Sequence, residues 1–238
     1  TTLIKSLLPS QETLHIDLLD PETEDRIARN PSVLKSQFSE ALQRGIKWVF
    51  IDEIQKIPRI TDIVHSFIES SPLLFALTGS SARKLKREGT NLLAGRAFMN
   101  HLHPLTHLEL RDRFNEKAAM EYGTLPKVIN LEDDFSRKEY LRTYALTYVK
   151  EEIREEQVVR KLDPFRNFLE IAAQMNGEIV NYSNIARDVG SDPKTIQSYY
   201  QILEDTLIGY PLEPYGRSVR KRQRHNPKFY FFDAGVKR

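Results

Sequence analysis

A continuous apolar run that ends in two acids constrains the fold more than any other feature of this sequence. Residues 48–51 read Trp-Val-Phe-Ile, and Asp52 and Glu53 follow directly. Apolar side chains at successive positions suit a strand that is covered on both faces, as in a parallel sheet, rather than a strand with one solvated face. The run therefore predicts a buried parallel strand with two carboxylates at its carboxyl end.

The first half of the chain alternates such runs with helical patterns. Residues 14–19 and 73–77 are two further short apolar runs, and residues 60–70 carry an apolar stripe at helical spacing. A helix with an asparagine cap and a proline at its first position is expected over 31–42, and a strand over 98–110. This alternation predicts an α/β fold built on a parallel sheet with right-handed crossovers.

The second half is predicted to be mostly helical. Residues 135–157 read as one long polar helix. Three shorter helices are expected over 164–176, 181–189 and 192–205, and a β-rich end follows them. Their lengths and short connections are typical of a winged helix-turn-helix, in which the last helix is the recognition helix.

The two acids after the apolar run fit a Walker B pattern, because a strand of this kind delivers its carboxylates to the sheet edge where ligands collect. In that interpretation Asp52 holds the Mg²⁺ ion of a nucleotide, and Glu53 orients or deprotonates the attacking water. The alternative is a strand that ends in two solvated acids. Apolar runs followed by Asp-Glu are common by chance, so this pattern alone leaves both interpretations open.

Polar residues elsewhere fit the same site. Thr78 and Ser80 follow the next apolar run, where either could sense a γ-phosphate, although a Gly-Ser turn that caps a helix is equally compatible. Thr1 and Thr2 look like the start of the helix after a phosphate-binding loop, with the Thr1 hydroxyl on Mg²⁺; the alternative is an ordinary helix start. The complete loop motif, G-x-x-x-x-G-K-[ST], is missing. We therefore expect the natural protein to begin further upstream, and this segment alone to bind nucleotide poorly.

Several ordered motifs resemble a branch of the AAA+ superfamily of archaeal and bacterial ATPases. They are IDEIQKIP at 51–58, LTGSSARKL at 77–85, NLLAGRA at 91–97, LEDTLI at 203–208 and KFYFFDAGV at 228–236. Proteins of that branch carry an ATPase domain, a winged-helix region and a nuclease-like C-terminal domain. The resemblance implies ATP and Mg²⁺ as cofactors, with Asp52 as the acid of the Mg²⁺ site and Glu53 as the catalytic base.

The resemblance also suggests an arginine finger. Arg96 precedes a predicted strand, where AAA+ proteins often place an arginine that neutralises the γ-phosphate of a neighbouring subunit, and Arg83 is a weaker candidate. The alternative for Arg96 is a surface arginine favoured by the dipole at a helix end. A finger of this kind implies a homo-oligomer as a partner.

Three parts are expected on the same basis. Residues 1–110 are the AAA+ core without its Walker A loop, residues 111–160 a helical lid or linker, and residues 161–238 the winged-helix unit with the start of a further domain. The chain ends where the nuclease-like domain of the family would begin. We therefore expect a fragment truncated at both ends.

Basic residues are concentrated near the C-terminal end of the chain. Residues 214–238 hold eight Lys and Arg against one Asp, although the whole chain carries only +2. Such polarity favours a polyanionic partner, with the basic run as a wing that grips phosphates. The expected nucleic-acid contacts are Lys194, Thr195, Gln197, Arg217, Arg220, Lys221, Arg222 and Arg224. The alternatives are a winged helix that binds protein and a basic run that is only solvated surface.

Together these features predict a Mg²⁺-dependent ATPase coupled to DNA binding through a winged helix. Two alternatives stay open: a nucleotide-dependent switch or DNA-binding regulator that hydrolyses little, and a protein-interaction scaffold. No membrane partner is expected, because no apolar run approaches the ~18–20 residues that a span requires. The absence of cysteine excludes disulfides, thiolate catalysis and Cys-ligated zinc, and it fits the reducing cytoplasm.

Overall fold

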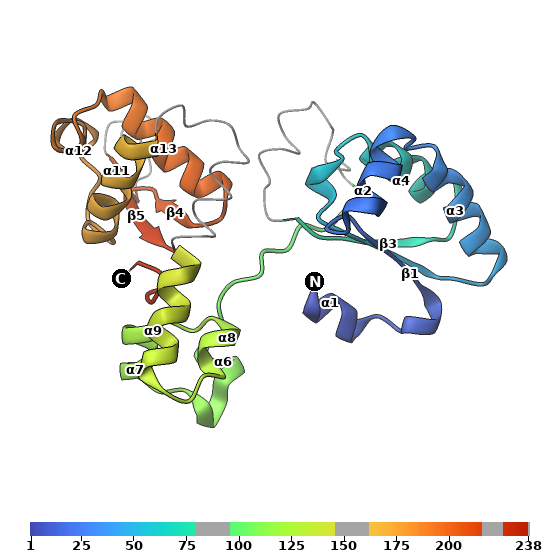
Figure 1. The fold of residues 1–238 in the computed structure, drawn as a ribbon, viewed down its shortest axis with the longest axis horizontal. Helices are drawn as coiled ribbons and strands as arrows, with labels where there is room; N and C mark the ends of the chain where they lie inside the picture. The colour runs from blue at the N-terminus through green and yellow to red at the C-terminus, as the bar shows by residue number, and fades with distance from the viewer. Residues whose placement is uncertain (80–95, 146–161, 216–225, 238) are drawn as a thin grey trace. The chain divides into compact units, whose positions relative to one another are not determined.

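The computed structural model describes residues 1–79, 96–145, 162–215 and 226–237. The chain forms two compact units, Thr1–Met99 and Asn100–Arg238, which are drawn in Figure 1. Each unit has its own hydrophobic core. Within the described residues, no helix combines the length and the apolar character that crossing a membrane would need.

A three-stranded parallel sheet organises the first unit. Its strands are β1 (Thr13–Asp17), β2 (Trp48–Asp52) and β3 (Leu74–Leu77), in the order β1-β2-β3. In the register of the sheet, Asp17 lies opposite Asp52, and Ile51 lies opposite Leu77. The central position of β2 and the parallel α/β architecture confirm the prediction from the apolar run.

Short helices connect these strands. They are α1 (Thr2–Leu7), the 3₁₀ turn η1 (Ser10–Glu12), α2 (Pro21–Arg29), α3 (Val33–Gln43), the 3₁₀ turn η2 (Ile54–Lys56) and α4 (Ile60–Ser70). Helix α4 has the bounds that its apolar stripe predicts. Its buried residues include Ile60, Ile63 and Val64, which lie on one face because they are three or four positions apart.

Helix α3 begins later than the sequence predicts. Val33 is its first residue and Ser32 its N-cap, so Asn30 and Pro31 precede the helix. The N–H groups of Val33 and Leu34 donate to the carbonyls of Asn30 and Pro31, in both cases at 3.1 Å. These bonds span three residues rather than four, so a tight turn leads into the helix at the position expected for its first turn.

The two faces of the sheet differ in their coverage. Figure 1 shows α2, α3 and α4 on one side of the sheet and α1 on the other. On the helix-covered side, Ile16, Val49 and Ile51 belong to the core of the unit. Alternation along a strand places His15 and Phe50 on the opposite face, where Phe50 is also buried. The same alternation puts Asp17 and Asp52 on the face that α1 covers.

The second unit begins with four short helices and a 3₁₀ turn. They are α6 (His107–Leu110), η3 (Arg111–Arg113), α7 (Glu116–Tyr122), α8 (Pro126–Ile129) and α9 (Asp134–Thr143). Most of the remainder of the long helix predicted over 135–157 lies outside the described residues.

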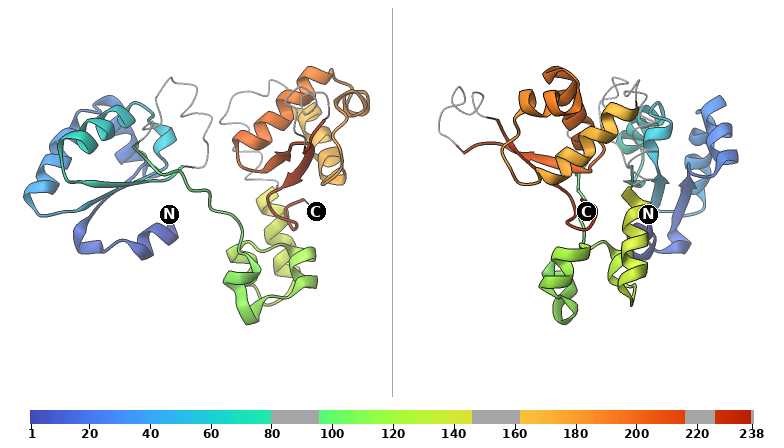
Figure 2. Two further views of the ribbon diagram at one scale, coloured as in Figure 1. Left: turned by 180° about the vertical axis from the view of Figure 1, so that it is seen from behind. Right: turned by 60° about the vertical axis from the view of Figure 1, so that its left-hand side comes forward.

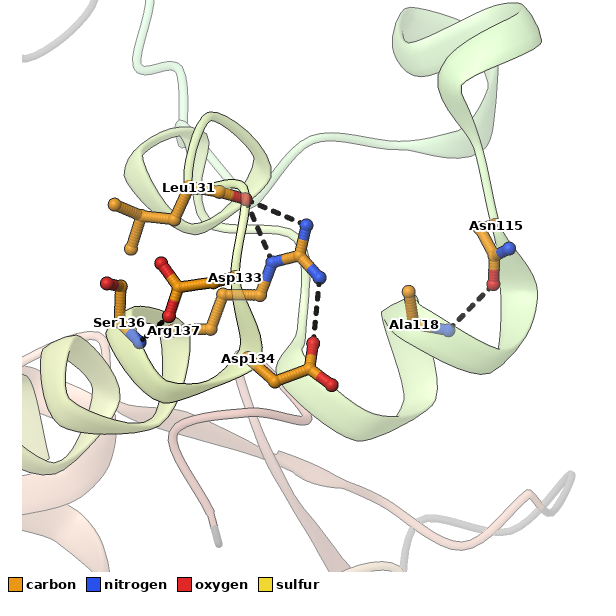
Figure 3. A network of polar contacts seen from close by, with 7 residues as sticks. All are labelled: Asn115, Ala118, Leu131, Asp133, Asp134, Ser136 and Arg137. Atoms are coloured by element: carbon orange, nitrogen blue, oxygen red, sulfur yellow. Dashed lines mark hydrogen bonds and ion pairs between the residues drawn. The ribbon is translucent and has the colours of Figure 1, made fainter.

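Side-chain caps and one arginine fix the ends of these helices (Figure 3). The Asn115 side chain accepts from the N–H of Ala118 at 2.9 Å and starts α7. Arg137 in α9 donates to the carbonyl of Leu131 through Nε at 3.0 Å and Nη2 at 2.7 Å, and its Nη1 pairs with Asp134 at 3.2 Å. The guanidinium therefore satisfies a carbonyl of the loop that precedes its own helix.

The strand predicted over 98–110 is wrong. Thr106 and Glu109 form a capping box that starts α6: the Thr106 hydroxyl accepts from the Glu109 N–H at 3.3 Å, and the Glu109 carboxylate accepts from the Thr106 N–H at 2.8 Å. Before this cap no regular element is present between residues 97 and 106. Phe98 and Leu102 are 99% and 78% exposed, and no strand among the described residues pairs with them.

Three helices and a pair of strands complete the second unit. They are α11 (Leu162–Gln174), α12 (Tyr182–Val189), α13 (Pro193–Asp205), β4 (Gly209–Leu212) and β5 (Lys228–Phe231), with β4 and β5 antiparallel. Asp192 caps α13 and Pro193 occupies its first position, as predicted. The Tyr200 ring meets the edges of the Phe168 and Phe229 rings, with ring centroids 4.9 and 4.8 Å apart. This contact packs β5 against α11 and α13, and the ribbon views of Figure 2 show these elements side by side.

Candidate functional site

A buried carboxylate with two hydroxyl partners lies at the carboxyl end of β2. Asp52 has no exposed surface. Its Oδ1 accepts from the Thr1 hydroxyl at 2.8 Å and from the Thr78 hydroxyl. Its Oδ2 is also buried and makes no hydrogen bond within the part of the chain that the structure describes. Burying a carboxylate oxygen that makes no hydrogen bond is energetically costly. Asp52 Oδ2 is therefore a candidate contact for a ligand.

Backbone hydrogen bonds hold the strand ends that carry these side chains. The Thr78 N–H donates to the Ile51 carbonyl at 3.0 Å, and the Thr78 carbonyl accepts from the Ile54 N–H at 3.0 Å. On the other side, the Leu18 N–H donates to the Asp52 carbonyl at 3.3 Å. Asp52 is therefore fixed between two neighbouring strand ends, which explains how residues far apart in the sequence meet at one carboxylate.

Glu53 follows in a strained backbone conformation. Its φ of +60° lies in the left-handed region, which costs a non-glycine residue about 1 kcal/mol or more. The residue is the N-cap of η2, and the Gln55 side-chain amide donates to its carboxylate. Strain of this kind persists where the surroundings over-determine the backbone, and it gathers at functional sites.

Two residues of β1 extend the site in a way that the sequence analysis missed. His15, Asp17 and Asp52 each place one ligand-type atom within 4.8 Å of the others. Asp17 Oδ1 accepts from the Leu19 N–H at 2.9 Å, and the His15 ring stacks on Phe50 with centroids 4.8 Å apart. The available signal was the His-x-Asp spacing on a strand predicted to lie in the same sheet as the Asp52 strand.

The imidazole of His15 has a perturbed acidity. Desolvation is the main cause that lowers the pKa of His15, and the positive charge of Lys5 acts in the same direction. The carboxylates of Asp17 and Asp52 oppose both effects by favouring the protonated ring. The net result is a lowered pKa, which favours the neutral form of the ring.

The other predicted residues of this site lie in different settings. Thr2 is exposed at the first position of α1. The Arg96 guanidinium pairs with Glu69 of α4 at 2.6 Å, and Nε2 of His65 lies 3.6 Å from the same Glu69 oxygen. Ser80 and Arg83 lie outside the described residues.

Some of the residues predicted to contact nucleic acid lie on α13, and the others lie outside the described residues. Lys194 and Gln197 are exposed on α13. Thr195 is half-buried, and both its N–H and its hydroxyl bond to the Asp192 cap. Tyr199 of the same helix is buried against Phe165 and Phe168. The basic residues Arg217, Arg220, Lys221, Arg222 and Arg224 lie outside the described residues.

Comparison with known families agrees with the parallel α/β fold of the first unit. Residues 1–111 match the family described as an AAA domain, which supports an assignment of this unit to the AAA-like ATPase superfamily. Residues 114–238 match a family described as a domain of unknown function, DUF8612. That match spans more than half of the chain, and the chain therefore belongs to the DUF8612 family.

Related proteins of known sequence are longer than this chain. It is 24% identical over 190 residues to Uncharacterized protein Rv2008c of Mycobacterium tuberculosis, covering 79% of this chain and 43% of that protein. It is 25% identical over 207 residues to an uncharacterized protein of Haemophilus influenzae, covering 80% of this chain and 52% of that protein. The chain thus spans about half the length of these relatives. No solved structure matches it significantly.

Proposed function

We propose that the protein is a Mg²⁺-dependent ATPase of the AAA type, with its nucleotide site at the carboxyl end of β2. The single observation that carries this proposal is the buried Asp52 carboxylate, which receives hydroxyl groups from Thr1 and Thr78. The match of residues 1–111 to an AAA domain supports the same activity.

The residues around Asp52 fit a hydrated Mg²⁺ ion. Magnesium prefers oxygen ligands and keeps several of its waters, so one carboxylate and one hydroxyl are sufficient protein contacts. Asp52 and Thr1 would hold the ion, and the buried Oδ2 of Asp52 supplies an oxygen that the described residues leave without a hydrogen bond. When bound, Mg²⁺ neutralises negative charge on the phosphates.

Glu53 and Thr78 take the remaining roles in this proposal. Glu53 accepts a proton from the attacking water, and the Gln55 amide that donates to its carboxylate orients it. The Thr78 hydroxyl donates to Asp52 and so links this carboxylate to the end of β3. In this proposal the Thr78 hydroxyl also senses whether a γ-phosphate is present. Arg96, now paired with Glu69, would act on a neighbouring subunit after that ion pair opens.

The experiment for this proposal is a Glu53→Gln substitution in the full-length protein. ATP binding is expected to persist because the amide fills the same space, while single-turnover hydrolysis falls by about 10²–10⁴-fold. Glu22→Gln, an exposed acid on α2, is the matched control. Equal hydrolysis in both variants would refute the role of Glu53. Tight ATP binding without hydrolysis in the unsubstituted protein would favour the nucleotide-dependent switch.

We infer further that residues 162–237 form a winged helix-turn-helix that binds DNA. Helices α12 and α13 are joined by the short turn from Gly190 to Asp192, and the antiparallel pair β4 and β5 follows them. The basic residues 217–224 fall between these two strands, where a wing would be. Lys194 and Gln197 are exposed on α13 and available for contacts with DNA. A protein-binding winged helix is the competing interpretation.

The location and assembly of the protein follow from this function. ATP and DNA are both met in the cytoplasm, so we place the protein there.

An arginine finger acting between subunits requires a homo-oligomer. Light scattering with and without ATP and Mg²⁺ tests the assembly, and a monomer under both conditions would exclude a finger supplied by a second copy.

A further inference from the structure

The carboxyl ends of β1 and β2 bring an imidazole and two carboxylates to one face of the sheet. Asp17 and Asp52 are direct neighbours in the parallel register. His15 precedes Asp17 by two positions, so the alternation of the strand places both side chains on the same face. One ligand-type atom of each residue lies within 4.8 Å of the other two. These three side chains come from two strands, and the backbone ladder fixes their spacing.

Two features show that this cluster is more than a group of exposed acids. Asp52 is fully buried, and its Oδ2 makes no hydrogen bond to any residue that the structure describes. In addition, like charges directly opposite each other on neighbouring strands repel, which makes the Asp17–Asp52 pair unfavourable without a cation. Both features point to a positively charged ligand between the carboxylates.

We propose that His15, Asp17 and Asp52 form a binding site for a first-row divalent transition metal ion of the Mn²⁺ or Zn²⁺ class. The imidazole of His15 indicates the class of metal ion, because nitrogen ligands suit transition metals, while Mg²⁺ and Ca²⁺ prefer sites made only of oxygen. Three protein ligands leave coordination positions open for water or for a further ligand.

Modest movement of the side chains would complete the site. Ligand atoms on one ion lie about 3 Å apart, because each metal–ligand bond is about 2.1 Å. The exposed His15 ring can turn away from its stack on Phe50 to reach this spacing. Asp17 is held in place by the Leu19 N–H on Oδ1, an outer contact of the kind that orients metal ligands.

This inference does not rest on the proposed ATPase activity, although both use Asp52 Oδ2, so the transition metal ion and the Mg²⁺ of a nucleotide would compete for this oxygen. The site is assembled from β1 and β2 of the chain itself and needs no nucleotide. Lys5, whose charge acts on His15, opposes a cation there, so Lys5→Met is expected to tighten metal binding.

The test is a titration of the nucleotide-free chain with Mn²⁺, followed by the loss of the electron paramagnetic resonance signal of the free ion. One ion is expected to bind, and a large excess of Mg²⁺ is expected not to displace it. His15→Phe keeps an aromatic ring over Phe50 but removes the nitrogen ligand, and it is expected to weaken Mn²⁺ binding by at least about tenfold. His65→Phe, at a half-buried histidine of α4, is the matched control and should change nothing.

Nuclear magnetic resonance can show directly whether Mn²⁺ binds beside His15, which separates loss of a ligand from a structural effect of the substitution. Substoichiometric Mn²⁺ should broaden the ring resonances of His15 before those of His65. Unchanged affinity in His15→Phe, or displacement of Mn²⁺ by equal Mg²⁺, would overturn the proposal. An inactive ATPase that still binds Mn²⁺ through His15 would refute the proposed function alone, and an active ATPase without this binding would refute the metal site alone.

Discussion

The Asp233 carboxylate accepts a hydrogen bond at 2.8 Å from the backbone N–H of Thr124, across 109 positions of the chain. Its other oxygen, Oδ1, accepts from the N–H groups of Gly235 and Val236 at 2.8 and 3.2 Å. Asp233 is only 4% exposed. One buried side chain therefore fastens the segment after β5 to the loop after α7, and it organises the turn that carries Val236 into a small core with Tyr122.

The first prediction concerns pH. Burial raises the pKa of Asp233, against the opposing effect of its three backbone donors. An acid whose pKa is higher in the folded state than its unfolded value of about 3.9 binds protons more tightly when folded. Its contribution to the free energy of unfolding is therefore greatest below the unfolded pKa and is lost as pH rises through the folded pKa.

Asp233→Asn should remove that pH dependence. The amide cannot ionise, and its NH₂ group faces a backbone donor, so stability at neutral pH should fall by about 1–3 kcal/mol. Urea unfolding at a series of pH values above about 4 measures both effects. The decrease in stability with rising pH should be steeper in the unsubstituted protein than in the variant. Parallel pH profiles would contradict the assignment to Asp233.

The second prediction concerns the close approach of Gly123 to the same carboxylate. A Cβ at Gly123 would lie 1.8 Å from Asp233 Oδ1, and its φ is +72°. Gly190 has nearly the same φ, +71°, but a Cβ there would meet nothing within 4 Å. Gly190→Ala, at a ψ of 41° in the left-handed region, should therefore cost about 1 kcal/mol from backbone strain. Gly123→Ala, at a ψ of −166° that is essentially confined to glycine, should cost about 1–3 kcal/mol more, from the steric clash and from this backbone conformation. Equal losses in urea unfolding would show that the loop relaxes without cost.

The third prediction concerns the hydroxyl that Thr78 donates to Asp52. Thr78→Val keeps the shape of the side chain but leaves the buried carboxylate with one hydroxyl donor fewer, so the free energy of unfolding should fall by about 1–3 kcal/mol. Thr78→Ser retains the hydroxyl and is the matched control. If valine and serine destabilise the protein equally, the hydroxyl contributes nothing to the stability of this strand end.

Local signals explain which parts of the fold were predictable. The apolar run of β2, the stripe of α4 and the Asp192-Pro193 start of α13 each specify their element within a few neighbouring residues. The strand expected over 98–110 does not form, and the capping box at Thr106 and Glu109, whose residues the sequence displays, starts a helix there instead.

The contacts that the sequence did not reveal depend on register and on distance along the chain. Whether His15 faces Asp52 depends on which residues of β1 and β2 are paired, and a shift by one position would turn His15 to the other face. The bond between Asp233 and Thr124 has no local signature at either residue. The proximity of Asp52 and Thr78 was predictable because parallel strands end at a common edge, whatever their detailed register.

The last prediction tests DNA binding through its electrostatics. Each phosphate contact contributes about −0.9 to the slope of log affinity against log salt concentration. Replacing Arg220, Arg222 and Arg224 by Glu should therefore weaken binding to any DNA sequence and reduce that slope by about three. Replacing Arg29, Lys35 and Arg44 by Glu changes the net charge equally on exposed positions of the first unit and is the control. Gel-shift titrations at several salt concentrations measure both quantities. If the two triple variants bind alike, long-range charge alone accounts for any affinity, and the proposed winged helix would then have to serve a protein partner.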